Sequence, residues 1–218
     1  MLKLFLFIGL LGAILMYIGD MVLYFSRDAG VSLGTINDII DIMKKESWKR
    51  LYTGGIIGPI AAFLYCIGYY HLVLIMNDQY QVLGWICFFI NCLGIICGGA
   101  YHSHCAYLGL IGRHEHKESM NEIIKYLGVQ KYFVFGLQGI GFLALAVFIV
   151  CGWTVMPRWM FFFSPGILFF FAPLTKKLPK GLNIAIGGGW TNWISIIYYA
   201  LVLITTYVYN DLILGDMI

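Results

Sequence analysis

Residues 82–111, VLGWICFFINCLGIICGGAYHSHCAYLGLI, decide the fold. A membrane-spanning helix needs about 20 predominantly apolar residues, and this run exceeds that length. At 1.5 Å per residue it would cover about 45 Å, whereas the hydrocarbon core of a bilayer is about 30 Å thick. We therefore expect this helix to tilt, to bend near Gly94, Gly98 and Gly99, or to continue into the cytoplasm.

Five more apolar runs flank this one, near residues 2–25, 51–76, 127–153, 159–174 and 182–209. The run at 159–174 is short and holds Pro165 and Pro173, which predicts a broken or re-entrant segment. Hydrophobic residues make up 61% of the 218 residues and charged residues 11%, against about 25% charge in a soluble domain. The sequence predicts an all-α bundle of six transmembrane helices, with residues 1–218 forming a single integral membrane domain.

Loop charges predict the orientation of the chain. The loops after the first, third and fifth runs hold twelve of the 14 Lys and Arg residues, whereas the opposite side holds Lys3 and Arg158. The positive-inside rule makes the basic side cytoplasmic, so we expect an inner (plasma) membrane protein with both termini outside. The net charge is only +3, and its basic residues lie in short loops, which excludes nucleic-acid binding as a main role.

Residues 32–50, between the first two runs, are predicted to form an amphipathic helix on the cytoplasmic interface. Thr35 is a suitable N-cap, with Asp38 three residues later. Apolar residues recur with helical spacing at positions 36, 39, 40 and 43. A covering helix that binds no ligand is the simpler interpretation of this segment.

Two polar residues stand out inside the apolar runs, where a polar group needs a partner, a cavity or water. Asp20 shares a helix face with small residues, so it should point into the bundle. His102 shares its face with Asn91 and two glycines, as the wall of a cavity would. We interpret Asp20 and His102 as a candidate catalytic pair, in which the carboxylate orients the imidazole.

The sequence predicts no metal site and no cofactor. His104 follows His102 by two residues and points about 200° away, so one regular helix cannot aim both rings at one ion. The six cysteines contain no C-x-x-C pair and fall within or beside apolar runs, which favours buried small hydrophobic residues over a disulfide framework or a zinc knuckle.

The start of the last run adds candidate ligand-binding residues. Gly187-Gly188-Gly189 precedes Trp190-Thr191-Asn192-Trp193, and three glycines bring the backbone close to a neighbouring helix or to a ligand. We expect Asn192 and Trp193 to lie with Asp20 and His102 in the cytoplasmic half. Three further positions complete the set of predicted ligand-binding residues: Asn91 offers a second amide, and Arg50 or Arg113 could meet an anionic group.

Four segments carry a resemblance to a known family: Gly19-Asp20, Gly54-Gly55-Ile56-Ile57-Gly58-Pro59 after Trp-x-Arg-Leu, Gly99-Ala100-Tyr101-His102-Ser103, and Gly188-Gly189-Trp190-Thr191-Asn192. Together they resemble an uncharacterised family of bacterial multi-pass membrane proteins. The resemblance spans most of the chain and implies no activity. It does imply that Asp20, His102 and Asn192 belong to one site.

We hypothesise that the protein binds or processes a lipid-like amphiphile from the cytoplasmic leaflet; whether it is an enzyme stays open. A small proton-coupled transporter would use the same Asp and His as a proton relay, although the predicted outer half is nearly bare of polar residues. A non-catalytic membrane subunit or sensor would bind partner helices through its glycine faces, which also leave room for a homo-oligomer. A cavity that reaches only the cytoplasmic half would favour the first hypothesis.

Overall fold

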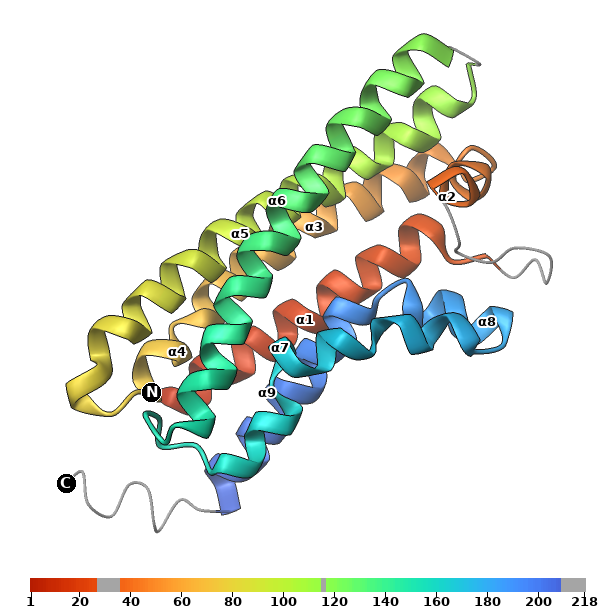
Figure 1. Ribbon diagram of the computed structural model, residues 1–218. Helices are drawn as coiled ribbons and strands as arrows, with labels where there is room; N and C mark the ends of the chain where they lie inside the picture. The colour runs from red at the N-terminus through yellow and green to blue at the C-terminus, as the bar shows by residue number, and fades with distance from the viewer. Residues whose placement is uncertain (27–35, 115–116, 209–218) are drawn as a thin grey trace.

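The computed structural model describes residues 1–26, 36–114 and 117–208, and these ranges are helical with an isolated bridge between Met76 and Thr154. Figure 1 shows the helices as α1 to α9. The α-helices are α1 (Leu2–Tyr24), α2 (Ile36–Met43), α3 (Trp48–Tyr69), α4 (His71–Leu74), α5 (Gln81–Gly112), α6 (Lys117–Val150), α7 (Pro165–Leu168), α8 (Lys180–Leu182) and α9 (Trp190–Val208). Shorter 3₁₀ segments are η1 (Asp78–Tyr80), η2 (Arg158–Phe163) and η3 (Phe169–Lys177), and η4 (Asn183–Gly187) is a π-helical turn.

Within the described ranges, five helical stretches are long and apolar enough to cross a membrane: Leu2–Tyr24, Trp48–Leu74, Asp78–Gly112, Glu118–Val150 and Trp190–Val208. The fold is therefore all-α and consistent with a membrane protein. The sixth predicted run, at 159–174, is not one continuous helix, as its two prolines lead us to expect. It consists of η2, the four-residue α7 and most of η3. Pro165 begins α7 and Pro173 lies inside η3, and proline removes a backbone donor that a continuous α-helix needs.

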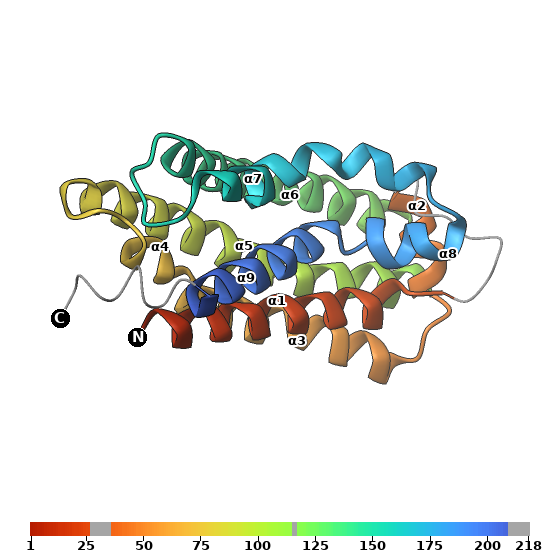
Figure 2. The same ribbon diagram turned by 90° about the horizontal axis from the view of Figure 1, so that it is seen from below.

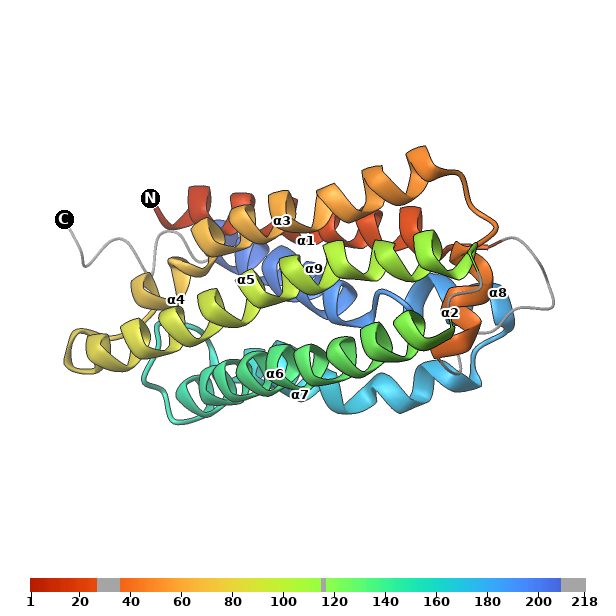
Figure 3. The ribbon, with the colours of Figure 1, turned by 90° about the horizontal axis from the view of Figure 1, so that it is seen from above.

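The elements form three layers, which Figures 2 and 3 show from opposite sides. Helices α1 and α3 form one layer, α5 and α9 the middle layer, and α6 with the η2–η3 segment the third. In Figure 1 the N-terminus and the C-terminal end of α9 lie at one end of the bundle, with α2 and α8 at the other. The η2–η3 segment runs beside α6 between those two ends.

Small residues let the layers approach closely. A Cβ atom at Gly12 would lie 2.9 Å from the backbone nitrogen of Tyr65, and one at Gly68 would lie 2.3 Å from Cα of Gly9. The α3–α5 contact also uses a proline. Because Pro59 has no N–H, it leaves the carbonyl of Gly55 free, and the Ser103 hydroxyl donates to that carbonyl at 2.7 Å. Close backbone approach of this kind is typical of helix packing within membranes.

Within its described part, residues 36–50, the predicted amphipathic segment is two elements rather than one helix. Helix α2 ends at Met43, and after a turn the side chain of Ser47 accepts a hydrogen bond from the backbone N–H of Arg50 to cap α3. The predicted N-cap Thr35 lies outside the described residues. Met43 is buried and packs on Gly109 of α5, so α2 covers one end of the bundle.

Candidate functional site

A cavity of about 400 Å³ lies between α1, α5, α6, α9 and the segment formed by α7 and η3. This volume falls in the lower part of the roughly 300–1,000 Å³ range of small-molecule pockets. Most of the lining is apolar, and side chains of Ile36 and Ile39 on α2 close the end nearest the basic loops. One wall is polar and holds Asp20, His102 and Asn192.

These three predicted residues come from three helices and meet in that wall. The Nδ2 atom of Asn192 donates to Oδ2 of Asp20 at 2.7 Å, and Nε2 of His102 lies 3.2 Å from Oδ1 of Asp20. The side chain of Asp20 is 14% exposed and that of His102 is 7% exposed. The carboxylate therefore has one partner on each oxygen, one from α9 and the other from α5.

Packing holds the imidazole of His102 in place. A Cβ atom at Gly58 would lie 2.6 Å from Cβ of His102, and one at Gly19 would lie 2.9 Å from its Cε1. The ring is therefore clamped between α3 and α1, at positions where only glycine leaves room. The contact with Asp20 does not have hydrogen-bond geometry, and neither ring nitrogen has a hydrogen-bond partner among the described residues. Both nitrogens are buried, with Nε2 beside Asp20 and Nδ1 beside Gly58.

A directed hydrogen-bond chain supports the carboxylate. The Tyr65 hydroxyl donates to Oδ1 of Asn192 at 3.1 Å, and Asn192 in turn donates to Asp20. The Tyr24 hydroxyl donates to the carbonyl of Gly188, just after the π-helical turn η4. Such turns are frequent at functional sites because they displace backbone groups from the regular helical pattern.

Sequence reasoning missed the tyrosines and one amide of this cavity. Tyr65 and Tyr69 line it, and the Tyr69 hydroxyl donates to Oε1 of Gln138 at 3.1 Å. A signal existed for Tyr65, which follows Gly58 by seven residues and so shares its helix face. A tyrosine in an apolar run is more readily interpreted as an anchor at the membrane interface, so its role as a cavity-lining hydrogen-bond donor is easily missed.

Two predicted ligand-binding residues lie outside the cavity lining. Asn91 is buried, donates from Nδ2 to the carbonyl of Cys87 at 2.8 Å, and packs on Gly141. Its Oδ1 atom lacks a partner in the described part of the chain. Trp193 donates from Nε1 to the carbonyl of Ala185 at 3.1 Å, and its ring packs on that of Tyr17. Both side chains join helices or turns to one another.

The two predicted arginines also lie outside the cavity lining. Arg50 forms an ion pair with Glu46 and donates to carbonyls at the C-terminal end of α1, those of Met21, Val22 and Phe25. The carbonyl of Met21 also accepts from the backbone N–H of Phe25, whereas the last carbonyls of a helix lack such a partner, so a guanidinium is a suitable cap for this end. Arg113 donates to the carbonyls of Lys44 and Glu46 and so joins α5 to the turn after α2.

The second histidine of α5 is separate from the site, as its predicted angle requires. Nδ1 of His104 lies 2.9 Å from Oε1 of Gln130 on α6, whereas His102 faces Asp20 on α1. Across residues 1–26, 36–114 and 117–208, no group of three or more His, Cys, Asp and Glu side chains lies close enough to hold a metal ion.

No curated protein and no solved structure matches the chain. A family model does match, over residues 1–209, which is nearly the whole chain. The protein therefore belongs to the family of unknown function DUF6796.

Proposed function

We propose that this protein binds a lipid-like amphiphile in the cavity of about 400 Å³, with the polar head at the Asp20–His102–Asn192 wall. The observation that carries the proposal is the unequal lining, in which Asp20, His102 and Asn192 meet in one wall and apolar side chains form most of the remaining surface. Apolar surfaces bury a hydrocarbon tail favourably, and a few convergent polar groups orient the head. An amphiphile satisfies both parts of such a cavity at once.

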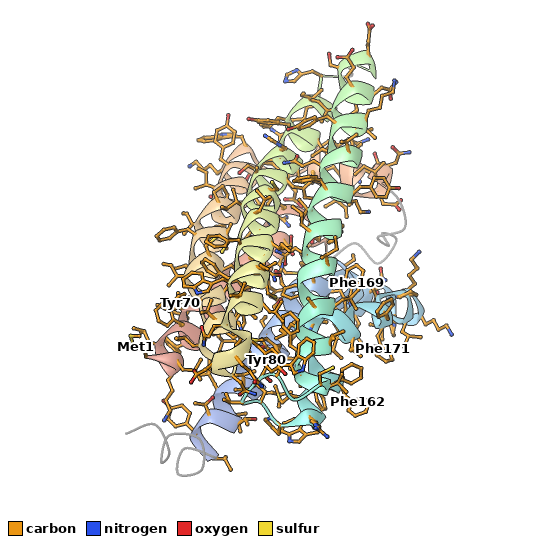
Figure 4. All side chains as sticks on the ribbon, turned by 60° about the vertical axis from the view of Figure 1, so that its left-hand side comes forward. Met1, Tyr70, Tyr80, Phe162, Phe169 and Phe171 are labelled. Atoms are coloured by element: carbon orange, nitrogen blue, oxygen red, sulfur yellow. The ribbon has the colours of Figure 1, made fainter. Side chains whose placement is uncertain are left out.

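The side between α6 and η3 offers a route from the membrane. Phe135 on α6 and Phe169 on η3 both line the cavity, and their rings lie 6.0 Å apart across this side. Phe170 also lines the cavity while being 66% exposed. In Figure 4, Phe169 lies beside α6. Aromatic side chains that are partly in the cavity and partly on the outer surface suit the entry of a molecule from surrounding lipid.

The proposal includes a membrane orientation. The end with α2 and α8 carries most of the basic residues. By the positive-inside rule, this end faces the cytoplasmic side of an inner membrane. With the broken segment 158–177 as the sixth crossing, both termini face outside and the cavity opens to the cytoplasmic leaflet. Cysteines introduced at Lys3 and Lys45 should then label from opposite sides of the membrane; labelling from one side would contradict this orientation.

The same wall can carry acid–base chemistry. Asp20 holds a position 3.2 Å from Nε2 of His102, and an imidazole exchanges protons near neutral pH. A head group bound to the Asp20 carboxylate would lie close to Nε2 of His102. His102 would then accept or donate a proton, while Asp20 stabilises the imidazolium.

Filling the cavity tests the proposal. Gly139 on α6 lines the cavity, and a Cβ atom there meets nothing within 4 Å, so Gly139→Phe should occupy the space without disturbing helix packing. Gly136→Phe is the matched control, because position 136 is equally open on the same helix but does not line the cavity. The probes are single-chain dodecyl compounds added to the protein in phosphatidylcholine nanodiscs, and the measurement is thermal stabilisation.

We expect at least one dodecyl compound to stabilise the wild type and Gly136→Phe but not Gly139→Phe. A ligand at 100 times its Kd stabilises a protein by about 2.7 kcal/mol, which is readily measured. Equal stabilisation of all three proteins, or of none, would contradict binding in this cavity.

A proton-coupled carrier is the second candidate, because polar contacts continue beyond the cavity. Nε2 of Gln138 donates to the carbonyl of Asn91 at 2.9 Å. Further toward the end that holds the N-terminus, Nε2 of His71 lies 3.0 Å from the Tyr198 hydroxyl, and both residues are buried. The half of the bundle nearest the N-terminus therefore contains more polar contacts than the sequence indicates. Gradient-driven proton movement in proteoliposomes that disappears in Asp20→Asn would favour the carrier.

A further inference from the structure

We propose that the amphiphile carries a cationic head group, an amine or a quaternary ammonium. This inference rests on the proposed function and names the chemistry of the ligand. It follows from the charges of the cavity wall, from the direction of its hydrogen bonds and from its aromatic lining.

The charge of the polar wall is negative when His102 is neutral. Among the lining residues in the described ranges, the charged side chains are Asp20 and Lys131, with His102 as the titratable neighbour of Asp20. Asp20 is nearly buried, whereas Lys131 is exposed and its Nζ lies 5.9 Å from the centre of the Phe135 ring. A charge interacts more strongly where water is excluded, so Asp20 dominates the polar wall.

The arginines that would suit an anionic head group are committed elsewhere. Arg50 caps α1 and pairs with Glu46, and Arg113 binds carbonyls of the turn after α2. Neither is a lining residue. An anionic head beside Asp20 would instead place two negative charges together with no guanidinium to separate them, and unpaired buried charge is costly.

Hydrogen-bond directions lead to the same conclusion. The Tyr65 hydroxyl donates to Asn192, and the Asn192 amide donates to Asp20. These donors of the wall are therefore already hydrogen-bonded within the protein. The Tyr24 hydroxyl is spent on the carbonyl of Gly188. The wall thus offers an acceptor that is also a negative charge, namely the carboxylate of Asp20. A primary ammonium brings both donors and positive charge to it, and a quaternary ammonium brings positive charge alone.

Tyrosine rings complete the site. Tyr24, Tyr65, Tyr69 and Tyr101 all line the cavity together with Asp20. Aromatic rings attract organic cations through their electron-rich faces, and clusters of them with a carboxylate recognise quaternary ammonium groups. The same rings pack against the first carbons of a tail, so they serve both the head and its junction with the chain.

The test compares head groups on one tail. Dodecylamine, dodecyltrimethylammonium, dodecanol and dodecyl sulfate are titrated into wild type, Gly139→Phe, Gly136→Phe and Asp20→Asn in phosphatidylcholine nanodiscs. Subtracting the Gly139→Phe response removes effects of partitioning into the lipid. In the wild type and in Gly136→Phe, we expect a cationic compound to bind about tenfold or more tightly than dodecanol, since its positive charge would lie beside the nearly buried carboxylate of Asp20 whereas the hydroxyl of dodecanol is neutral.

Asp20→Asn should bring the affinity for the cationic compounds down to that for dodecanol. Should this variant fail to fold, the order of affinities in the wild type still decides. Equal binding of all four head groups, or tighter binding of dodecyl sulfate, would overturn the cationic head group while leaving the amphiphile site in place. No difference between Gly139→Phe and Gly136→Phe with any compound would overturn the proposed function itself.

Discussion

The substitution Gly58→Ala tests how the site is built, because it adds one carbon between α3 and the imidazole of His102. The new Cβ would lie 2.6 Å from Cβ of His102 and 2.7 Å from its Cγ and Nδ1. Ordinary contact begins at 3.4 Å, so the ring must move by about 0.8 Å. The backbone of α1 blocks its retreat, since Gly19 lies against the far side of the ring.

The magnitude follows from two opposing effects. Overpacking by one carbon costs about 1–3 kcal/mol. Replacing a glycine inside a helix by alanine contributes about 1 kcal/mol in the other direction. Gly136→Ala is the matched control, because a Cβ atom at position 136 meets nothing within 4 Å and should only stabilise. We therefore expect Gly58→Ala to be less stable than Gly136→Ala by about 1–3 kcal/mol.

Thermal unfolding of both variants in nanodiscs measures this difference. For a chain of this length 1 kcal/mol corresponds to about 2–4 °C in Tm, so the two midpoints should differ by several degrees. A second measurement, the effect of Asp20→Asn on the stability of each protein, reports on the site itself. Displacing the ring removes its contact with Asp20, so Asp20→Asn should cost less in the Gly58→Ala background than in the wild type. Equal midpoints for Gly58→Ala and Gly136→Ala would refute the clamp around His102.

Two other predictions concern contacts between helices. Asp20→Asn and His102→Ala should each destabilise the protein, and the double variant should lose less than the sum, with a coupling of about 0.5–3 kcal/mol; strict additivity would mean that the pair does not interact. The thiols of Cys66 on α3 and Cys92 on α5 approach each other's backbone carbonyls, at 4.0 and 3.9 Å respectively, so a membrane-permeant oxidant should link them. Mass spectrometry should detect that intramolecular disulfide and its loss in Cys66→Ser, and failure to form it would contradict the packing of α3 on α5.

Helix class and the central site residues could be predicted because both depend on local composition. Apolar runs of sufficient length have few solutions other than membrane-spanning helices, and the five long helices coincide with five predicted runs, although α6 begins at Lys117 instead of 127 and α9 at Trp190 instead of 182. The convergence of Asp20, His102 and Asn192 was predictable because a polar side chain in such a helix needs a partner, and few partners exist at the same depth. Their chemical roles stay predictions.

Local patterns predict that the segment 159–174 is broken, but not its 3₁₀ conformation, and they do not predict the contacts of the arginines. The composition of 159–174 is apolar enough for a helix, but Pro165 and Pro173 produce 3₁₀ turns and a short α7 whose position depends on α6. Arg50 was expected to meet a ligand. Its actual partners are the terminal carbonyls of α1, more than twenty residues away in the sequence. A cap from a different helix leaves no periodic signal in the sequence.

The structure shows what most of the glycines contact, and this bears on the hypothesis of a non-catalytic subunit that binds partner helices through its glycine faces. Gly19 and Gly58 make room for His102, while Gly9 and Gly68 let α1 and α3 touch. Since contacts within the chain use these faces, they do not support binding of a partner helix. The open glycines of α6, at positions 128 and 136, are different, because an added Cβ there meets nothing within 4 Å. A homo-oligomer built on glycine faces would therefore use open positions such as Gly136 on α6, which does not line the cavity.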